Sequence, residues 1–250
     1  MIFKQLFEPH SSTYTYLLGC ETTGLAVLID PVLETFDRDL DAVRELGLKL
    51  AFTLETHIHA DHLTSARKLK AIAGSRIAAP KLDNLSCTDV PIEEGRAFHC
   101  GEITLHPLFT PGHTDTHHAY VLEQRGMRRL FSGDALLIEG CGRTDFQNGN
   151  SEALFRSVRQ KLFALPDETL VYPAHDYHRR QVSSIGQEKT RNPRLALDKS
   201  LDDFVRIMAG LNLPYPAKMQ YAVPGNRECG KCPPNVPAEF RSDCEIHDQG

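Results

Sequence analysis

The 250-residue sequence contains no tryptophan, no repeat and no low-complexity segment, and none of its apolar runs approaches the ~20 residues that a membrane span needs. The net charge of −5 leaves no basic excess, which argues against nucleic acid and membrane surfaces as partners. The first residues lack the apolar core of a secretory signal and the Arg- and Ser-rich composition of a transit peptide. We therefore expect a cytoplasmic globular protein.

Cysteine is too sparse for a disulfide scaffold. The seven cysteines are odd in number and scattered along the chain, which favours reduced thiols. The pair Cys229-x-x-Cys232 has the spacing of half a zinc site, but no second pair accompanies it. Two ordinary thiols are the simpler interpretation, and an approach of Cys229 to the active site is a second hypothesis.

Apolar periodicity predicts strands and helices that alternate along the chain. Helices are expected at about 36–47, 63–74, 151–163 (with Ser151 as the N-cap) and 198–209. Strands are expected at 13–18, 25–29, 50–54, 77–79, 103–109, 118–122, 129–131 and 170–172, and an irregular arm after Leu213. No linker divides the chain, so we expect one domain, 1–228, followed by a tail of unknown role, 229–250.

Histidine, in contrast, is abundant, and five of the 12 histidines follow predicted strands. The segment His57-x-His59-x-Asp61-His62 places three imidazoles and one carboxylate together after the strand 50–54. Three further strands are followed by a histidine, an aspartate and a histidine respectively, namely His113, Asp134 and His175. Imidazole and carboxylate ligands suit Zn, Fe or Mn rather than Ca or Mg. The sequence therefore predicts a metal site built from strand ends.

These seven residues resemble the ligand set of the metallo-β-lactamase superfamily. The resemblance implies an α+β fold, the αββα sandwich of two mixed β-sheets flanked by helices, with the metals at one edge. By ligand count alone the set would hold two metals with Asp134 between them. A pair of metals that share a hydroxide can hydrolyse a thioester, as in the glyoxalase II branch of the superfamily.

Segments beyond Asp134 resemble a different branch. The runs 133–147, 172–177, 192–195, 211–214 and 222–224 together resemble the persulfide dioxygenases, also called sulfur dioxygenases. The resemblance implies one Fe(II) per chain, held by His57, His113 and Asp134 as a 2-His-1-carboxylate triad with open positions for O₂ and a persulfide sulfur. Glutathione persulfide would be oxidised to sulfite and glutathione. The other four residues would orient ligands and waters instead of binding a second metal: His59, Asp61, His62 and His175.

Glutathione persulfide carries carboxylates, which a guanidinium group binds in a two-pronged way. Arg143, Tyr177 and Arg191 lie close in sequence to the predicted ligands or to the family segments, and we expect them to contact the substrate. The alternative for each arginine is a structural salt bridge, and for Tyr177 a core hydroxyl. A separate sulfurtransferase and a second copy of the chain are partners that the sequence leaves open.

Three functional hypotheses follow. The first is a mononuclear Fe(II) persulfide dioxygenase, and the second is a dinuclear thioester hydrolase of the glyoxalase II type. The third is a non-catalytic metal-binding or redox-sensing module that uses Cys229 and Cys232. Zinc has no redox chemistry, so the identity of the bound metal separates the first hypothesis from the second.

Overall fold

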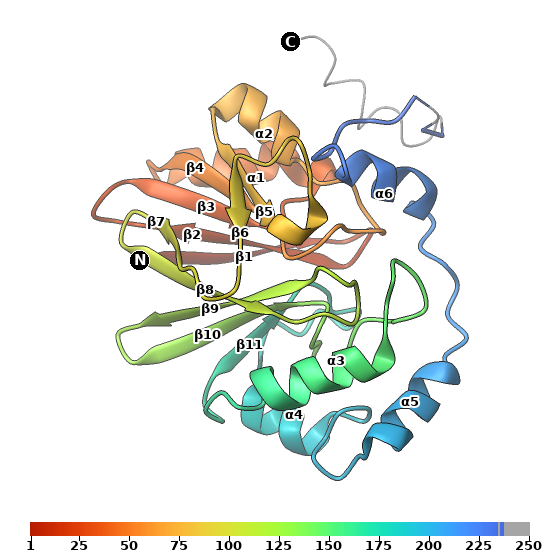
Figure 1. Cartoon of the computed structure of the whole chain (residues 1–250). Helices are drawn as coiled ribbons and strands as arrows, with labels where there is room; N and C mark the ends of the chain where they lie inside the picture. Colours follow the sequence, from red (N-terminus) through yellow and green to blue (C-terminus); the bar gives the residue numbers. More distant parts are fainter. Residues whose placement is uncertain (235, 238–250) are drawn as a thin grey trace. The chain divides into compact units, whose positions relative to one another are not determined.

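The structure, a computed structural model, describes residues 1–234, 236 and 237, and these divide into two compact units (Figure 1). The first unit comprises residues 1–91, 100–103 and the described residues from 215 on, and the second comprises 92–99 and 104–214. Each unit is built mainly on one six-stranded sheet. The boundary expected at residue 228 stays a prediction, and most of the expected tail lies outside the described residues.

The first sheet is mixed. Its strands follow one another in chain order, and they are β1 (Ile2–Glu8), β2 (Thr13–Gly19), β3 (Leu25–Ile29), β4 (Lys49–Leu54), β5 (Arg76–Pro80) and β6 (Val90–Ile92). The pairs β1–β2 and β2–β3 are antiparallel, whereas β3–β4 and β4–β5 are parallel. Parallel neighbours need a crossover connection, and helices α1 (Phe36–Glu45) and α2 (Ala66–Ala73) provide it.

Helices α1 and α2 cover the same sheet (Figure 1). Leu40 and Val43 of α1 and Leu69 of α2 pack in one buried cluster with Leu17 and Leu28 of the strands. The helical spacing of these apolar residues puts them on the face that the sheet covers.

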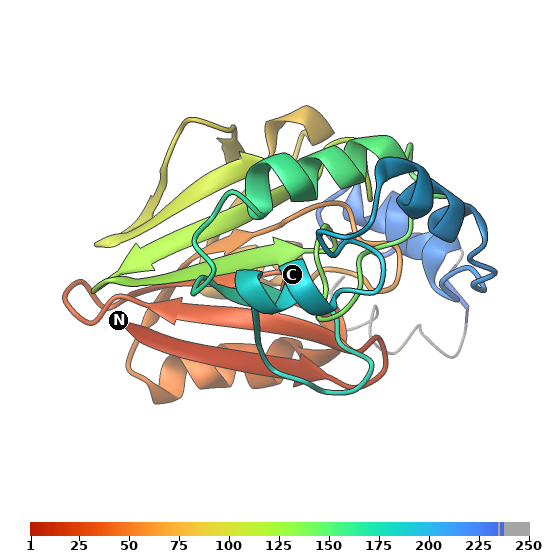
Figure 2. The ribbon, with the colours of Figure 1, turned by 90° about the horizontal axis from the view of Figure 1, so that it is seen from below.

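The second sheet is also mixed, and its strands run in reverse chain order. They are β12 (Ser183–Ser184), β11 (Leu170–Pro173), β10 (Met127–Gly133), β9 (His118–Gln124), β8 (Ile103–Phe109) and β7 (Phe98–Cys100). Only the pair β10–β11 is parallel among the registers known for this sheet. Its helices are α3 (Ser151–Ser157), α4 (Ile185–Arg191) and α5 (Leu201–Ala209). Figure 2 shows α3 beside α5, where the rings of Phe155 and Phe204 lie 5.6 Å apart between centroids.

The expected fold class, an α+β fold with two mixed sheets and flanking helices, is confirmed, and the expected strands are all present. Three kinds of local expectation were wrong. Two helices begin later than expected: α2 begins at Ala66 and not at 63, because residues 57–64 follow an irregular path, and α5 begins at Leu201 and not at 198, because Ser200 is its N-cap. The N-cap of α3 is Asn150, whose side chain accepts a hydrogen bond from Ala153 N.

The third correction concerns the irregular arm expected after Leu213. Residues Met219–Asn226 form helix α6 in spite of Pro224 inside it. Tyr221 on α6 is buried in a cluster with Leu33 and Leu63, and this packing holds a helix that sequence propensity disfavours. Among the described residues, no helix is both long enough and apolar enough to cross a membrane.

The turn between β1 and β2 depends on one buried carboxylate, Glu8. Burial opposes its ionisation, but hydrogen bonds from Ser11 and His10 outweigh burial and lower the pKa of Glu8 to about 2. A depressed carboxyl pKa adds stability that is fully present above the ordinary value, 4.5, and is lost as the pH falls towards 2.

We therefore expect Glu8→Gln to reduce the free energy of unfolding at pH 6, and the difference from the wild type to shrink as the pH falls from 5 to 2.5. Urea unfolding at several pH values measures this difference. A penalty that is constant over this range would contradict the role of the charge.

Candidate metal centre

Parallel pairing brings the ends of β3 and β4 to one edge of the first sheet. Asp30 directly follows β3, and Glu55, Thr56 and His57 directly follow β4. Asp30 Oδ1 accepts a hydrogen bond from Thr56 N (2.8 Å), and Asp30 Oδ2 accepts one from the Thr56 hydroxyl (2.9 Å). Asp30 has a left-handed backbone (φ 49°), which aspartate tolerates better than most residues.

The hydroxyl of Thr56 fixes the tautomer of His57. Its proton is donated to Asp30, so the oxygen accepts from His57 Nδ1–H, which lies 2.9 Å away. The Nε2 atom of a neutral His57 then carries a lone pair. This is the arrangement that orients a metal-binding histidine through its other nitrogen.

His59 is held by two carboxylates. Its Nε2 lies 3.1 Å from Asp30 Oδ1 and 3.5 Å from Glu55 Oε2, and all three residues are buried. Burial opposes the charged form of His59, but the two carboxylates outweigh burial and raise its pKa well above the ordinary value. Its Nδ1 is buried, and no described group forms a hydrogen bond with it.

Asp61 and His62 form a pair of their own, in which His62 Nδ1 lies 3.0 Å from Asp61 Oδ2. Thr13, at the start of β2, reaches both residues at 3.4–3.5 Å. The rings of His57 and His62 flank that of His59, with centroids 4.1 and 4.3 Å from it. The structure thus brings together His57, His59 and His62, as the motif predicts, with Asp61 bonded to the last of them.

Strand direction brings the other three predicted ligands together within the second unit. Strands β8, β10 and β11 run the same way, because β8 and β10 are both antiparallel to β9, and β10 is parallel to β11. His113, Asp134 and His175 follow the ends of these strands. A register shift between Phe131 and Gly133 immediately precedes Asp134, and irregularities of this kind re-aim side chains beside active sites.

His113 and Asp134 face each other. His113 Nδ1 donates to the carbonyl of Arg143 (2.7 Å), which leaves a lone pair on Nε2 of the neutral ring. That Nε2 lies 3.4 Å from Asp134 Oδ2. The backbone at Gly142 passes so close that a Cβ there would lie 2.7 Å from His113 Nδ1. Glycine at this position therefore allows the loop to support the ring.

Asp134 is anchored through its backbone by a histidine that the sequence did not single out. His117 Nε2 accepts from Asp134 N (3.1 Å), and His117 Nδ1 lies 2.8 Å from the hydroxyl of Thr110. Asp134 Oδ1 is buried, lies 3.6 Å from His175 Nε2 and forms no hydrogen bond with any described donor.

These donor atoms suit a metal ion. His113 Nε2 and Asp134 Oδ2 lie 3.4 Å apart, and a cation held by both atoms would stabilise this arrangement of two acceptors. His57, on its own unit, presents the same kind of oriented imidazole nitrogen. Neutral imidazoles with a carboxylate are ligands for Fe, Zn or Mn.

The three predicted substrate residues have different surroundings. Arg143 is engaged: it forms a two-pronged ion pair with Asp145 at 2.6 Å and donates to the carbonyls of Leu213 and Pro214. Tyr177 is exposed, so the core alternative does not apply, and its ring stacks on His175. Arg191 is exposed at the end of α4.

Sequence reasoning missed the residues that hold the predicted ligands in place by hydrogen bonds. Asp30 reads as a strand terminator before a proline, and Glu55 as an ordinary strand end. Only the strand pairing shows that they meet at His59. Asn226 reads as part of an irregular arm, yet its side chain bonds to residues 59, 62 and 64.

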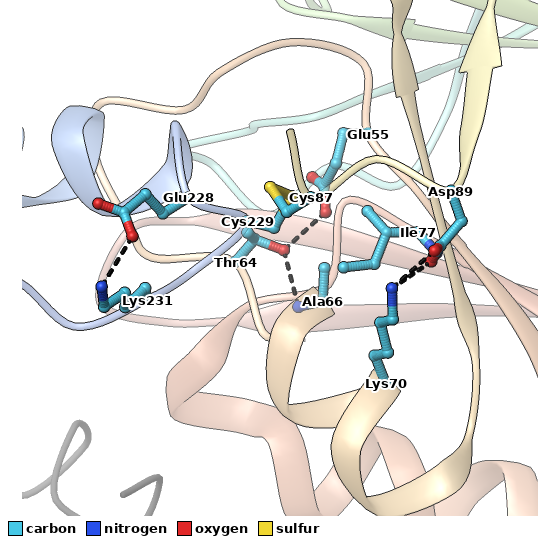
Figure 3. Close-up of a disulfide and its surroundings, with 10 residues drawn as sticks. All are labelled: Glu55, Thr64, Ala66, Lys70, Ile77, Cys87, Asp89, Glu228, Cys229 and Lys231. Atoms are coloured by element: carbon cyan, nitrogen blue, oxygen red, sulfur yellow. Dashed lines mark hydrogen bonds and ion pairs between the residues drawn. A yellow bond between two sulfur atoms is a disulfide. The ribbon is translucent and has the colours of Figure 1, made fainter. Parts of the chain in front are cut away.

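The expectation of reduced cysteines was wrong for Cys87, Cys229 and Cys232, each of which is disulfide-bonded. Cys87 and Cys229 form a disulfide with their Cα atoms 6.2 Å apart (Figure 3). The two residues are 142 positions apart, so no local spacing indicates the bond. Cys20, Cys100 and Cys141 are free and buried. Cys229 also lines a small cavity shared with His57 and His59.

Comparison with known proteins identifies the family. The model of the Metallo-beta-lactamase superfamily matches residues 9–175. The persulfide dioxygenase ETHE1 of Bos taurus is 47% identical over 94% of this chain and 91% of its own, and that of Homo sapiens is 46% identical over 92% and 89%. The chain belongs to the persulfide dioxygenase family of the metallo-β-lactamase superfamily. The expected family and enzyme class, an oxidoreductase of the dioxygenase type, are therefore confirmed.

Solved structures with a similar fold include a protein of this family. The crystal structure of ETHE1 from Myxococcus xanthus has a TM-score of 0.88 and 50% identity, and covers 92% of this chain and 100% of its own. The crystal structure of TTHA1623 in a di-iron-bound form has a TM-score of 0.61 and 27% identity, and covers 77% of this chain and 99% of its own. The hydroxyacylglutathione hydrolase of Methylococcus capsulatus is 36% identical over a smaller share, 66% of this chain and 62% of its own.

We expect Asp30→Ala to lower the free energy of unfolding by about 3–5 kcal/mol, because it leaves the buried donors of Thr56 and His59 without their acceptor. Asparagine also tolerates the left-handed backbone at position 30. Asp30→Asn therefore shows how much of the lost stability comes from the charge alone. Chemical denaturation with an intact disulfide measures both variants.

The matched control is Asp41→Ala, whose ion pair with Arg44 is exposed on both sides. It should cost less than about 1 kcal/mol. Equal losses for Asp30→Ala and Asp41→Ala would contradict the proposed support of the histidine segment.

Proposed function

We propose that this protein is a mononuclear Fe(II) persulfide dioxygenase that oxidises glutathione persulfide with O₂. The observation that carries the proposal is its 46–47% identity, over more than nine-tenths of the chain, to proteins named persulfide dioxygenase. The hydroxyacylglutathione hydrolase, which represents the thioester alternative, matches a smaller share of the chain at lower identity. The separate oriented donor sets of the two units support a metal enzyme in either case.

His57, His113 and Asp134 would hold the iron. When bound there, ferrous iron would supply the redox chemistry that couples O₂ to a persulfide sulfur, which zinc lacks. The overall change balances as one persulfide, one O₂ and one water giving one thiol, one sulfite and two protons.

The chain's own residues supply orientation. Thr56 and the carbonyl of Arg143 each accept from the Nδ1–H of a proposed ligand, so that Nε2 stays unprotonated. His117 fixes the backbone of Asp134. His59, Asp61, His62 and His175 would orient ligands and water by hydrogen bonds, and they are the residues that a second metal would require in the hydrolase alternative.

Tyr177 and Arg191 are the exposed candidates for contact with the glutathione moiety. Arg143 would need to exchange its ion pair with Asp145 to bind a substrate carboxylate, so its first role is to present the carbonyl that holds His113. A sulfurtransferase partner and a homodimer remain predictions, as does a cytoplasmic location, since the bovine and human relatives are named as mitochondrial.

Metal analysis of the purified protein should give about one iron per chain, and the iron-loaded protein should consume O₂ in the presence of glutathione persulfide. Asp134→Ala should remove both iron and O₂ uptake, because it deletes the only carboxylate of the proposed triad. Two metals per chain with hydrolysis of S-lactoylglutathione would instead establish the thioester hydrolase.

Arg191→Ala should raise the KM for glutathione persulfide about tenfold with little change in kcat, which is the effect of losing one charged hydrogen bond to the substrate. Steady-state O₂ uptake measures both constants. Arg206→Ala, at an exposed site on α5 whose arginine already pairs with Asp203, is the control. An unchanged KM in Arg191→Ala would remove Arg191 from the substrate site.

A further inference from the structure

The irregular segment 57–64 carries four of the predicted site residues and is buried along most of its length. Buried backbone outside helices and strands needs hydrogen-bond partners from elsewhere. Asn226, at the end of α6, supplies three of them. Its Nδ2 donates to the carbonyls of His59 (2.9 Å) and His62 (2.8 Å), and its Oδ1 accepts from Thr64 N (2.9 Å).

The amide side chain of Asn226 matches the hydrogen-bonding groups of this segment. An amide side chain offers two donors and an acceptor in one plane, and Asn226 uses both donors and the acceptor within a single segment. Its side chain is 4% exposed, so water does not compete freely for these bonds. Aspartate has the same shape but lacks the donors, and alanine lacks all three groups.

The residues that follow Asn226 stay against the same segment. Gly230 has a left-handed backbone (φ 90°), and a Cβ there would lie 2.0 Å from the carbonyl oxygen of Thr64. The carbonyl of Cys229 accepts from Arg67 N (3.0 Å), which satisfies one of the free N–H groups in the first turn of α2.

The Cys87–Cys229 disulfide ties this stretch to the loop after β5. Figure 3 shows the disulfide with Thr64, which donates to Glu55 Oε1 (2.6 Å) and accepts from Ala66 N (3.1 Å). The Cys87 loop is itself fixed, because Asp89 accepts from Ile77 N (2.9 Å) and pairs with Lys70 (2.6 Å). The disulfide therefore joins the residues after Asn226, which we call the anchor, to a loop that is itself held in place by hydrogen bonds and an ion pair.

We propose that Asn226 is a positioning residue for the metal-bearing segment 57–64, and that the Cys87–Cys229 disulfide keeps Asn226 in place. Reduction by a dithiol breaks the S–S bond, forms two cysteine thiols and oxidises the dithiol to its own disulfide. This loosens the anchor and weakens metal binding. The proposal rests on the metal-binding role proposed above for His57, but the conformation of the segment can be measured without metal.

Hydrogen exchange of the metal-free protein is the first test. Asn226→Ala and Asn226→Asp should both speed exchange in 57–64 relative to the wild type, with the second sheet unchanged. The Thr64 amide should stay protected in Asn226→Asp, which retains the acceptor oxygen, and should lose protection in Asn226→Ala. Asn212→Asp, at an exposed site, is the matched control.

Metal affinity is the second test, measured as Fe(II) competition with a chelator under anaerobic conditions. Loss of a group that orients metal ligands should weaken binding about 10- to 100-fold in Asn226→Asp. Once saturated with iron, the variant should retain the wild-type KM for persulfide. The double variant C87S/C229S and the dithiol-treated wild type should shift exchange and affinity in the same direction, whereas Cys20→Ser should not.

Unchanged exchange in 57–64 for both Asn226 variants would overturn the positioning role. Exchange that is altered in those variants but unaffected by breaking the disulfide would overturn the anchor. If the exchange results hold while the wild-type protein consumes no O₂ with persulfide, the proposed function fails and the positioning role stands.

Discussion

Parallel pairing of neighbouring strands is the constraint on which the site residues of each unit depend. In the first sheet it places Asp30 beside the segment that follows β4, and in the second it places Asp134 beside His175. Carboxyl ends of parallel strands share one edge, so a residue that follows each strand meets its counterpart without any long-range signal in the sequence. Both units use this arrangement to gather carboxylates and imidazoles.

Burial then determines how each histidine is oriented. A buried imidazole must satisfy one nitrogen to leave the other available, and different acceptors do this at different positions. A threonine hydroxyl serves His57, a backbone carbonyl serves His113, and carboxylates hold His59. The carboxylates raise the pKa of His59 and favour its charged form, whereas His57 and His113 face uncharged partners. Histidines that look alike in the sequence therefore have different electrostatic surroundings.

The sequence predicted the parts of the site that lie in short motifs. The ligand candidates and the strands before them were found because apolar runs and polar ends are local patterns. Asp30, Glu55 and Asn226 were missed because their roles arise from strand pairing and from a helix that contains a proline. The disulfide was missed for the same reason, since its two cysteines carry no shared local pattern. The family resemblance added the persulfide branch, which periodicity alone does not indicate.

The disulfide also changes the covalent topology of the chain. It closes a ring through residues 87–229, a stretch that includes the whole of the second unit's 104–214. Closing a ring with a sequence separation of 142 lowers the conformational entropy of the unfolded chain. In the chain-entropy model this raises the free energy of unfolding by about 5 kcal/mol. A single backbone cut inside this ring leaves two fragments joined in one molecule, which separate only when the disulfide is reduced.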